Sequence, residues 1–402
     1  MQPGQRSRVH PSRIILLAAG LSLGPTVSNS FARFAYALVL PAMREDLAFN
    51  FSQAGLLNTA NALGYLLGAI LTRLLVNHWG NKVLFRQGMI LTAAALIVTG
   101  LVHDLWSLAA CRIAGGIGGA AAFICGGALA GNIVAQDPKW SARCITIYFG
   151  GAGLGLILCG AFVPLWLDAE GAAGWPSIWI AMGVAAAIMT AISQTCVNQI
   201  EEPSHAAGSA AWPLSPMLAA FLSYICFGLG YIVYMTFIIA WLRIQGATSG
   251  DVAIMWSMLG LTTILSPLVW SGPLERWRGG RPMAAIMLTL GIGAGLPVLP
   301  VDPSWQLFTM QCSAALFGLG MFNVPASVSA LIKHSLPRPA WGSAMATFTI
   351  AFGLSQVIAP LTSGWMADIS GSLRGGLTLS SAIILLGAVL ALAQRPLHRQ
   401  QH

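Results

Sequence analysis

The sequence predicts an all-α integral membrane protein with twelve transmembrane helices in two six-helix halves. Three observations support this prediction: the composition, the recurrence of long apolar runs, and one polar interruption near the middle of the chain. Of the 402 residues, 56% are hydrophobic and only 8% are charged, whereas an average soluble domain has about 25% charged residues. A helix needs about 20 apolar residues to cross a bilayer core of roughly 30 Å.

Apolar runs of that length recur along the whole chain. They span residues 14–41, 52–75, 83–102, 106–134, 143–167, 175–197, 214–242, 252–272, 283–300, 305–332, 341–367 and 375–394. Because unpaired backbone groups are not tolerated in lipid, each run is expected to be a helix and the twelve are expected to form a bundle. The 45 glycines and 21 prolines fit this expectation, since small residues let membrane helices approach closely.

The longest polar interruption inside the bundle is NQIEEPSHAAGSAAWP, residues 198–213. It divides the chain into an N-terminal half, 1–197, and a C-terminal half, 214–402, each with six runs. An offset of 200 positions pairs Asp168 with Asp368. Such repeats are typical of membrane transporters whose two six-helix halves are related by an axis along the membrane normal.

The distribution of basic residues predicts the orientation. With the N-terminus in the cytoplasm, fifteen Lys and Arg residues fall on the inner side and only Arg44, Arg243 and Arg374 on the outer side. The positive-inside rule then places both termini in the cytoplasm, with the chain in a bacterial inner membrane. The basic residues are scattered over many short loops, so a nucleic-acid-binding role is excluded.

Two short links occupy equivalent points in the two halves. The link after the second run reads VNHWGNK, ending at Lys82, and the link after the eighth reads LERWRGGR, ending at Arg281. Both are tight, basic and contain glycine. This similarity at the same point of each half is further support for a repeated unit.

Over essentially its whole length the chain resembles the major facilitator superfamily. The superfamily signature G-x-x-x-D-R-x-G-R-K survives in degraded form in the first link, with Asn77 at the Asp position and Gly80 and Lys82 in place. The second link keeps an acid and a base, Glu275 and Arg276. The resemblance implies a secondary or facilitative transporter that works by alternating access, with these five residues acting in gating.

Two further stretches carry the resemblance. In the fourth run, LAACRIAGGIGG is similar to the R-x-x-x-G pattern of the superfamily, and the opening RFAYALVLPAMREDL resembles the YbfB/YjiJ-type subgroup. The fifth run lacks the Gly-Pro element of many drug/proton antiporters in the superfamily, because Ala161 follows Gly160. This departure counts against multidrug efflux without excluding it.

Two arginines, Arg33 and Arg112, are predicted to lie inside the membrane. All twelve acidic residues fall in loops or at helix ends, so neither arginine has an acidic partner within a run. Arg33 lies eight residues before Pro41 and Arg112 eight residues after Asp104, which places both about 12 Å below the outer boundary. The resemblance implies that the first and fourth helices line a central cavity.

Neutral polar residues at helical spacing are expected to surround the two arginines. The candidate substrate-binding residues are Arg33, Arg112, Asn29, Tyr36, Asn58, Asn61, Tyr65, Tyr231 and Gln356. On an α-helix Asn29, Arg33 and Tyr36 share one face. An arginine fork matches a carboxylate in bidentate fashion. The predicted function is therefore the transport of a small solute, an organic anion by preference.

Other interpretations remain open at this stage. Two structural alternatives are that Arg33 extends to Glu45 or Asp46 and that Arg112 binds backbone carbonyls or Asp104. An exporter of amphipathic drug-like compounds and a membrane sensor that does not transport are functional ones. An enzyme is not expected, because no serine stands beside a candidate base. We expect no cofactor and no metal, and the partners are a small-molecule substrate and the lipid bilayer around a monomer.

Overall fold

The computed structural model describes residues 10–203 and 212–397. Within those ranges every regular element is a helix. In chain order they are α1 (Pro11–Pro25), the π-helical segment η1 (Thr26–Phe34), α2 (Tyr36–Asp46), α3 (Phe51–Thr99), α4 (Leu105–Asn132), α5 (Pro138–Glu170), η2 (Ala172–Gly174), α6 (Trp175–Val197), η3 (Ser215–Met217), α7 (Leu218–Ile244), α8 (Ser249–Arg276), α9 (Arg281–Gly295), η4 (Leu296–Val298), α10 (Pro303–Met321), α11 (Asn323–Ser335), η5 (Arg338–Ala340), α12 (Trp341–Ser370) and α13 (Arg374–Ala393). Residues 204–211 of the predicted linker lie outside the described ranges.

The predicted all-α membrane fold with twelve spans is confirmed. Eleven continuous helical segments of the described chain are long and apolar enough to cross a membrane. One of them, α3, has 49 residues, which would extend roughly 70 Å if it were straight, more than twice the thickness of a bilayer core. It reverses at Gly80, where φ is 77° and ψ is 166°, so α3 contains the second and third predicted spans.

The ends of the helices follow from local sequence. Asp104 accepts a hydrogen bond from the Ser107 amide at the start of α4, and Asp137 accepts from the Lys139 amide at the start of α5. These side chains satisfy amide groups that have no partner within the first helical turn. Gly171 and Gly371, with φ of 74° and 67°, end α5 and α12 in conformations that residues with a side chain rarely adopt.

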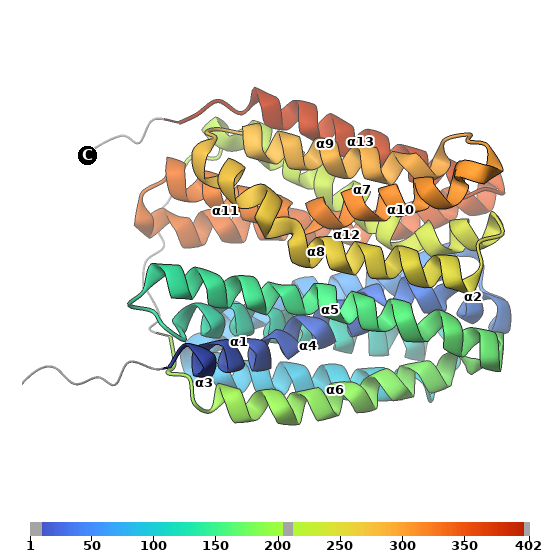
Figure 1. Ribbon diagram of the computed structural model, residues 1–402, viewed down its shortest axis with the longest axis horizontal. Helices are drawn as coiled ribbons and strands as arrows, with labels where there is room; N and C mark the ends of the chain where they lie inside the picture. Colours follow the sequence, from blue (N-terminus) through green and yellow to red (C-terminus); the bar gives the residue numbers. More distant parts are fainter. Residues whose placement is uncertain (1–9, 204–211, 398–402) are drawn as a thin grey trace, which may run out of the picture.

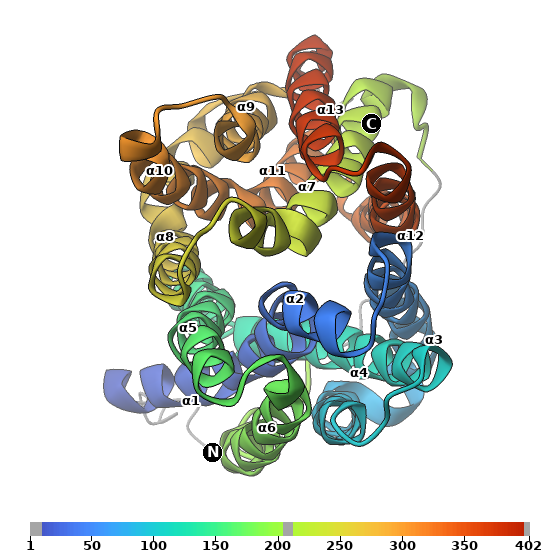
Figure 2. The same cartoon turned by 90° about the vertical axis from the view of Figure 1, so that its right-hand side faces the viewer.

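The helices form two bundles that lie one against the other (Figure 1). The N-terminal bundle contains α1 to α6 and the C-terminal bundle contains α7 to α13. Both described chain ends lie at the same end of the molecule, which we call the terminal face; the other end is the opposite face. Figure 2 shows the opposite face, with α5 beside α8, α3 beside α12, and α2 facing α7 across the contact between the bundles.

Glycines allow the closest approaches between the bundles. A side-chain carbon on Gly55 of α3 would collide with the Pro360 carbonyl of α12, and one on Gly153 of α5 would lie 2.6 Å from the Gly260 carbonyl of α8. These contacts run from the middle of the helices toward the opposite face. Near the terminal face, a side-chain carbon on Gly272, in the last turns of α8, would meet no atom within 4 Å. The bundles therefore contact each other most closely on the side of the opposite face.

Two spans differ from the uniform α-helices that the sequence predicted. The first is α-helical only at its ends, because η1 interrupts it, so the predicted α-helical face of Asn29, Arg33 and Tyr36 is wrong. The tenth is divided between α10 and α11 at Phe322, three residues before Pro325, which has no amide hydrogen to bond to the Met321 carbonyl of a continuous helix. Neither interruption ends the apolar run that contains it, which explains why the runs did not reveal them.

Candidate functional site

Segment η1 is the irregular centre of the first span. Its last turn is closed by a bond of 2.8 Å from the Ala35 amide to the Ser30 carbonyl, five residues earlier. The Thr26 hydroxyl donates to the Gly151 carbonyl at 2.7 Å, and the Ser30 hydroxyl donates to the Ala152 carbonyl at 2.6 Å. These bonds hold η1 against α5. Single π-helical turns occur frequently at functional sites, because they displace side chains from regular helical positions.

Arg33 lies on η1 and is buried, with 6% of its surface exposed. Its guanidinium carbon lies 5.1 Å from the ring centroid of Tyr65 on α3 and 5.8 Å from that of Phe34. Among the described residues it makes no hydrogen bond and no ion pair, and its Nε is fully buried without a partner. The predicted alternative, an extension toward Glu45 or Asp46, is not what the structure contains, since Asp46 instead accepts a bond from Trp175 at 2.7 Å.

Arg112 lies on α4 and is 3% exposed. Its Nη1 donates to the Ala32 carbonyl of η1 at 2.5 Å, while its Nε and Nη2 are buried without partners. The guanidinium carbon lies 4.7 Å from the ring centroid of Tyr36 and 5.5 Å from that of Trp179. Arg112 therefore binds a backbone carbonyl, as the structural alternative expected, and retains unused donors.

Asp104 does not pair with Arg112. It caps α4, and hydrogen bonds from Ser107 lower the pKa of the Asp104 carboxyl below its ordinary value. The two arginines are within electrostatic reach of each other, and all twelve acidic residues lie in described loops or near helix ends. An uncompensated charge at a helix centre costs about 2.5–3.5 kcal/mol on insertion scales. Two such cations create a positive potential in the middle of the protein.

The three predicted asparagines have different neighbours. Asn58 Nδ2 donates to Thr236 Oγ1 on α7 at 2.5 Å, a bond that joins the two bundles. Asn61 Nδ2 donates to the Arg112 carbonyl at 3.1 Å and leaves its Oδ1 buried without a partner. Asn29 Nδ2 is also buried without a partner. Asn58 is therefore engaged in packing, whereas Asn29 and Asn61 retain free hydrogen-bonding groups.

The predicted tyrosines and glutamine divide in the same way. The Tyr36 hydroxyl donates to the Ala54 carbonyl at 2.8 Å. Tyr65 and Tyr231 both lie within electrostatic reach of Arg33, and their hydroxyls have no hydrogen-bond partner in the described part of the chain. Gln356 Nε2 donates to a carbonyl of its own helix at 3.3 Å, and its Oε1 is buried without a partner.

An aromatic cluster on the C-terminal bundle extends to Arg33. The rings of Phe227 and Phe352 stack at 5.3 Å with planes 7° apart, and Phe227 stacks on Tyr231 at 4.9 Å. Phe34 meets the Tyr231 ring edge-on at 6.5 Å. Our sequence analysis missed Phe34, Phe227 and Phe352. The spacing of Phe227 and Tyr231, four residues apart on one helix, was a signal that could have found two members of the cluster.

The predicted gating residues lie on the terminal face. Gly80 forms the reversal in α3, and Asn77, Glu275 and Arg276 are exposed. The structure adds an acid that the sequence analysis did not consider: Glu202 accepts hydrogen bonds from the Asn81 amide, from Asn81 Nδ2 at 3.0 Å and from the Lys82 amide at 3.3 Å. Glu202 thus supplies a carboxylate to the link in which Asn77 stands at the Asp position of the signature.

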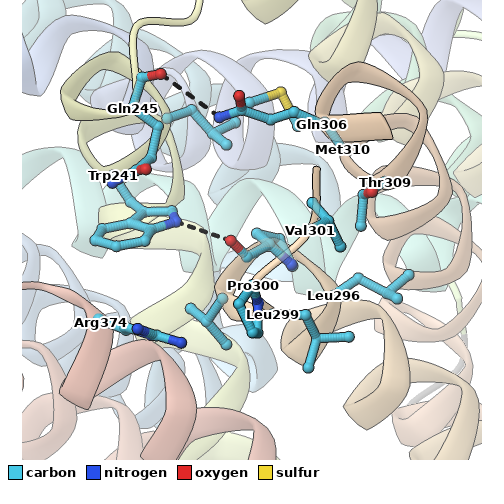
Figure 3. Close-up of a pocket in the computed structure, with 13 residues that line it drawn as sticks. Trp241, Gln245, Leu296, Leu299, Pro300, Val301, Gln306, Thr309, Met310 and Arg374 are labelled. Atoms are coloured by element: carbon cyan, nitrogen blue, oxygen red, sulfur yellow. Dashed lines mark hydrogen bonds between the residues drawn. The ribbon is translucent and has the colours of Figure 1, made fainter. Parts of the chain in front are cut away.

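A separate cavity of about 330 Å³ lies at the opposite face, within the C-terminal bundle (Figure 3). It is lined by the last turn of α7, by η4 and the residues that follow it, by the first turns of α10, and by Arg374 at the start of α13. Trp241 donates to the Pro297 carbonyl at 3.0 Å along one wall, and Arg374 is the single charged residue that lines it. None of the predicted site residues lines this cavity.

Twelve spans in two bundles, with the buried Arg33 and its aromatic neighbours where the bundles meet, are typical of a membrane transporter for solutes. The sequence family described as "Uncharacterised MFS-type transporter YbfB" matches residues 26–392. The chain therefore belongs to this family of major facilitator transporters, which confirms the predicted resemblance. It is a multi-pass membrane transporter of a small-molecule substrate, and neither an enzyme nor the non-transporting sensor that was considered as an alternative.

Two curated relatives are similar to this chain. A protein of Cupriavidus necator named "Probable sulfoacetate transporter SauU" is 23% identical over 388 residues, which cover 89% of this chain and 88% of that protein. A protein of Escherichia fergusonii named "Multidrug resistance protein MdtG" is 25% identical over 196 residues, which cover 47% of this chain and 46% of that protein.

Solved transporter structures share the fold. A D-xylose-proton symporter superposes with a TM-score of 0.73 and 13% identity, covering 96% of this chain and 97% of that one. A bacterial homologue of the human lysosomal transporter Spinster, in an inward-facing and unoccupied conformation, gives a TM-score of 0.67 and 14% identity, covering 97% and 96%. At these identities the likeness establishes the fold.

Proposed function

We propose that this transporter carries a small organic anion, with Arg33 as its main charge anchor. One observation carries the proposal: Arg33 is a buried cation that has neither a hydrogen-bond acceptor nor a counter-charge among the described residues. Burying a guanidinium that has no hydrogen-bond or ionic partner is unfavourable. Charged residues inside membrane spans typically mark the pathway of a solute. A bound carboxylate or sulfonate would accept its bonds and neutralise its charge.

The surrounding groups fit an anionic ligand. Arg112 holds Ala32, the residue before Arg33, and adds positive potential from α4. The amide nitrogen of Asn29 and the hydroxyls of Tyr65 and Tyr231 are available as donors. Supporting this assignment, the C. necator relative is named a probable sulfoacetate transporter, and sulfoacetate is a small organic anion.

We further propose that the terminal face is cytoplasmic and that the membrane is the bacterial inner membrane. The fifteen-to-three distribution of basic residues supports this orientation. The predicted halves, 1–197 and 214–402, are then the bodies that rock against each other, joined by the linker 198–213. A single chain supplies both bodies, so a monomer suffices for transport. We assign no coupling ion, because none of the described carboxylates stands beside the arginines.

A second candidate function is the export of amphipathic compounds. The stacked rings of Phe227, Tyr231 and Phe352 favour it, because aromatic faces bind apolar bodies with little dependence on the detailed structure of the compound. The E. fergusonii relative, named a multidrug resistance protein, also supports it.

Ligand-induced thermal stabilisation distinguishes the two candidates. The purified protein is heated with a panel of carboxylates, sulfonates, lipophilic cations and neutral solutes. A ligand at about 100 times its Kd adds roughly 2.7 kcal/mol to the apparent stability. We expect stabilisation by an anion in the native protein and its loss in Arg33→Gln, while Arg13→Gln, a change on the terminal face, retains it. Stabilisation only by lipophilic cations or neutral compounds, unchanged in Arg33→Gln, would refute the anion proposal.

A further inference from the structure

At the opposite face, the C-terminal bundle completes the start of a helix in the N-terminal bundle. The carboxylate of Asp368, at the end of α12, accepts the amides of Phe51 and Ser52 at 2.8 Å each and also accepts the Ser52 hydroxyl. These are the first two amides of α3. The third, from Gln53, is bound by Asn50 within the same bundle at 2.8 Å. Two of the otherwise unpaired amides of α3 are therefore satisfied only across the contact between the bundles.

A related contact occurs a second time with the bundles exchanged, although there the acid accepts a hydroxyl and the α8 amides are capped by Thr248 of their own bundle. Asp168, at the end of α5, accepts a hydrogen bond from the hydroxyl of Ser249, the first residue of α8. Arg243, at the end of α7, donates to the Ser249 oxygen at 2.5 Å and to the Ala247 carbonyl at 3.3 Å. Here the N-terminal bundle supplies the acid, and the C-terminal bundle supplies the helix start and a cation.

A cation also accompanies the first arrangement. The guanidinium carbon of Arg44, at the end of α2, lies 3.5 Å from the ring centroid of Phe51, and Arg44 is within electrostatic reach of Asp368. We call Arg44, Phe51, Ser52 and Asp368 the first cross-bundle cap. Arg243, Ser249 and Asp168 form the second cross-bundle cap.

The two caps occupy equivalent places in the internal repeat. Arg44 and Arg243 are 199 positions apart, Phe51 and Ser249 are 198 apart, and Asp168 and Asp368 are 200 apart. In each cap, the arginine lies at the end of the first span of one half, and the Phe or Ser lies at the start of the second span of the same half. The aspartate lies at the end of the fifth span of the other half. The offset that aligned Asp168 with Asp368 in the sequence thus relates two interactions of the same kind.

We propose that the two cross-bundle caps are a matched pair of latches that hold the opposite face closed and that both must open when the bundles rock apart. The Asp368 carboxylate is stabilised by the amides that it accepts, and both carboxylates lie at helix starts, where the helix dipole favours a negative charge. Because the caps lie at the ends of the spans, water replaces the carboxylate when they open, so no amide is left buried without a partner. The inference rests on alternating access between two moving bundles and does not depend on which solute is carried.

The distance between the bundles at the opposite face tests the proposal directly. All seven cysteines are free thiols, so they are first replaced to give a cysteine-free protein. Spin labels are then attached at Leu101→Cys in the N-terminal bundle and Val301→Cys in the C-terminal bundle, two exposed positions at the opposite face. Double electron–electron resonance in lipid nanodiscs, with no solute added, reports the proportions of short and long distances.

Each latch variant is expected to favour the long distance. A hydrogen bond to a charged group is stronger than one to a neutral group, so losing that charge should weaken the closed state. Asp168→Asn and Asp368→Asn should each raise the ratio of long to short distances roughly tenfold. The double variant should raise it further. Ser249→Ala should reproduce Asp168→Asn, and combining these two should add little, because they break the same interaction.

Glu170→Gln is the matched control. Glu170 lies two residues after Asp168, but it accepts its bond from Ser177 of the same bundle at 2.8 Å, so this variant should leave the distance ratio unchanged. The proposal is overturned if Asp168→Asn, Asp368→Asn and their combination, each eluting as a monodisperse protein, retain the native ratio, or if Glu170→Gln shifts it equally. Since no solute is present, failure of the anion assignment does not alter these outcomes.

Discussion

Replacing Arg33 with methionine should make the empty transporter more stable while abolishing anion binding. A charged residue at a helix centre costs about 2.5–3.5 kcal/mol on insertion scales. The ring of Tyr65, 5.1 Å away, recovers about 0.5–2 kcal/mol of that through a cation–π interaction. No hydrogen bond or ion pair within the described chain offsets the rest. Methionine has a side chain with a similar aliphatic stem and no charge, so the net gain in stability should be about 0.5–3 kcal/mol.

The assay is thermal unfolding of the two proteins in the same detergent, followed by intrinsic tryptophan fluorescence. The native protein should melt at a lower temperature than Arg33→Met without ligand, and the order should reverse when a saturating anion is present. A lower melting temperature of the empty variant would refute the reasoning, because it would show that Arg33 stabilises the fold. Such a result would make Arg33 a structural residue and favour the exporter.

Three other outcomes follow from the contacts described above. Arg112→Gln should destabilise the empty protein by about 1–3 kcal/mol, since it removes the donor to a buried carbonyl; an increase in its melting temperature would contradict this role. Gly55→Ala should collide with the Pro360 carbonyl and lengthen the distance between the bundles at the opposite face, measured with the same spin labels; an unchanged distance would show that the helices shift freely. Glu202→Gln should accelerate amide hydrogen exchange at the start of the third span, whereas Glu201→Gln, whose carboxylate makes no described hydrogen bond, should not; equal exchange in both variants would show that the Glu202 bonds are dispensable.

The sequence was sufficient to predict the spans, because each depends on local composition. A run of about 20 apolar residues has one stable structure in lipid, whatever surrounds it. The reversal at Gly80 was also predictable, since the basic link around it interrupts two apolar runs. The positions of the twelve acids also showed that no acid shares a run with Arg33 or Arg112, but only the structure decided against pairing with Glu45, Asp46 or Asp104.

Other features depend on neighbours that are distant in sequence and could not be predicted. The π-helical turn of η1 is held by carbonyls of α5, more than 120 residues away. The bond from Asn58, a predicted substrate-binding residue, to Thr236 could not be predicted, since helical spacing gives the face on which a residue lies and not its partner. Glu202 was read as part of a polar interruption, although it caps the link at Asn81. The assignment of the arginines to substrate binding stays a prediction.

The unusual first span has a consequence for the way the protein is made. Each strongly apolar residue contributes only about −0.3 to −0.6 kcal/mol to insertion, so the charge on Arg33 offsets several of them. The Ser30 hydroxyl bonds to α5, and the Thr26 hydroxyl makes its shorter bond there. The ribosome synthesises α5 more than 100 residues later. Until then, the nascent first span lacks the neighbours that complete it. Its final position in the bilayer is therefore expected to be reached late in biogenesis, and glycosylation mapping of truncated chains would report that order.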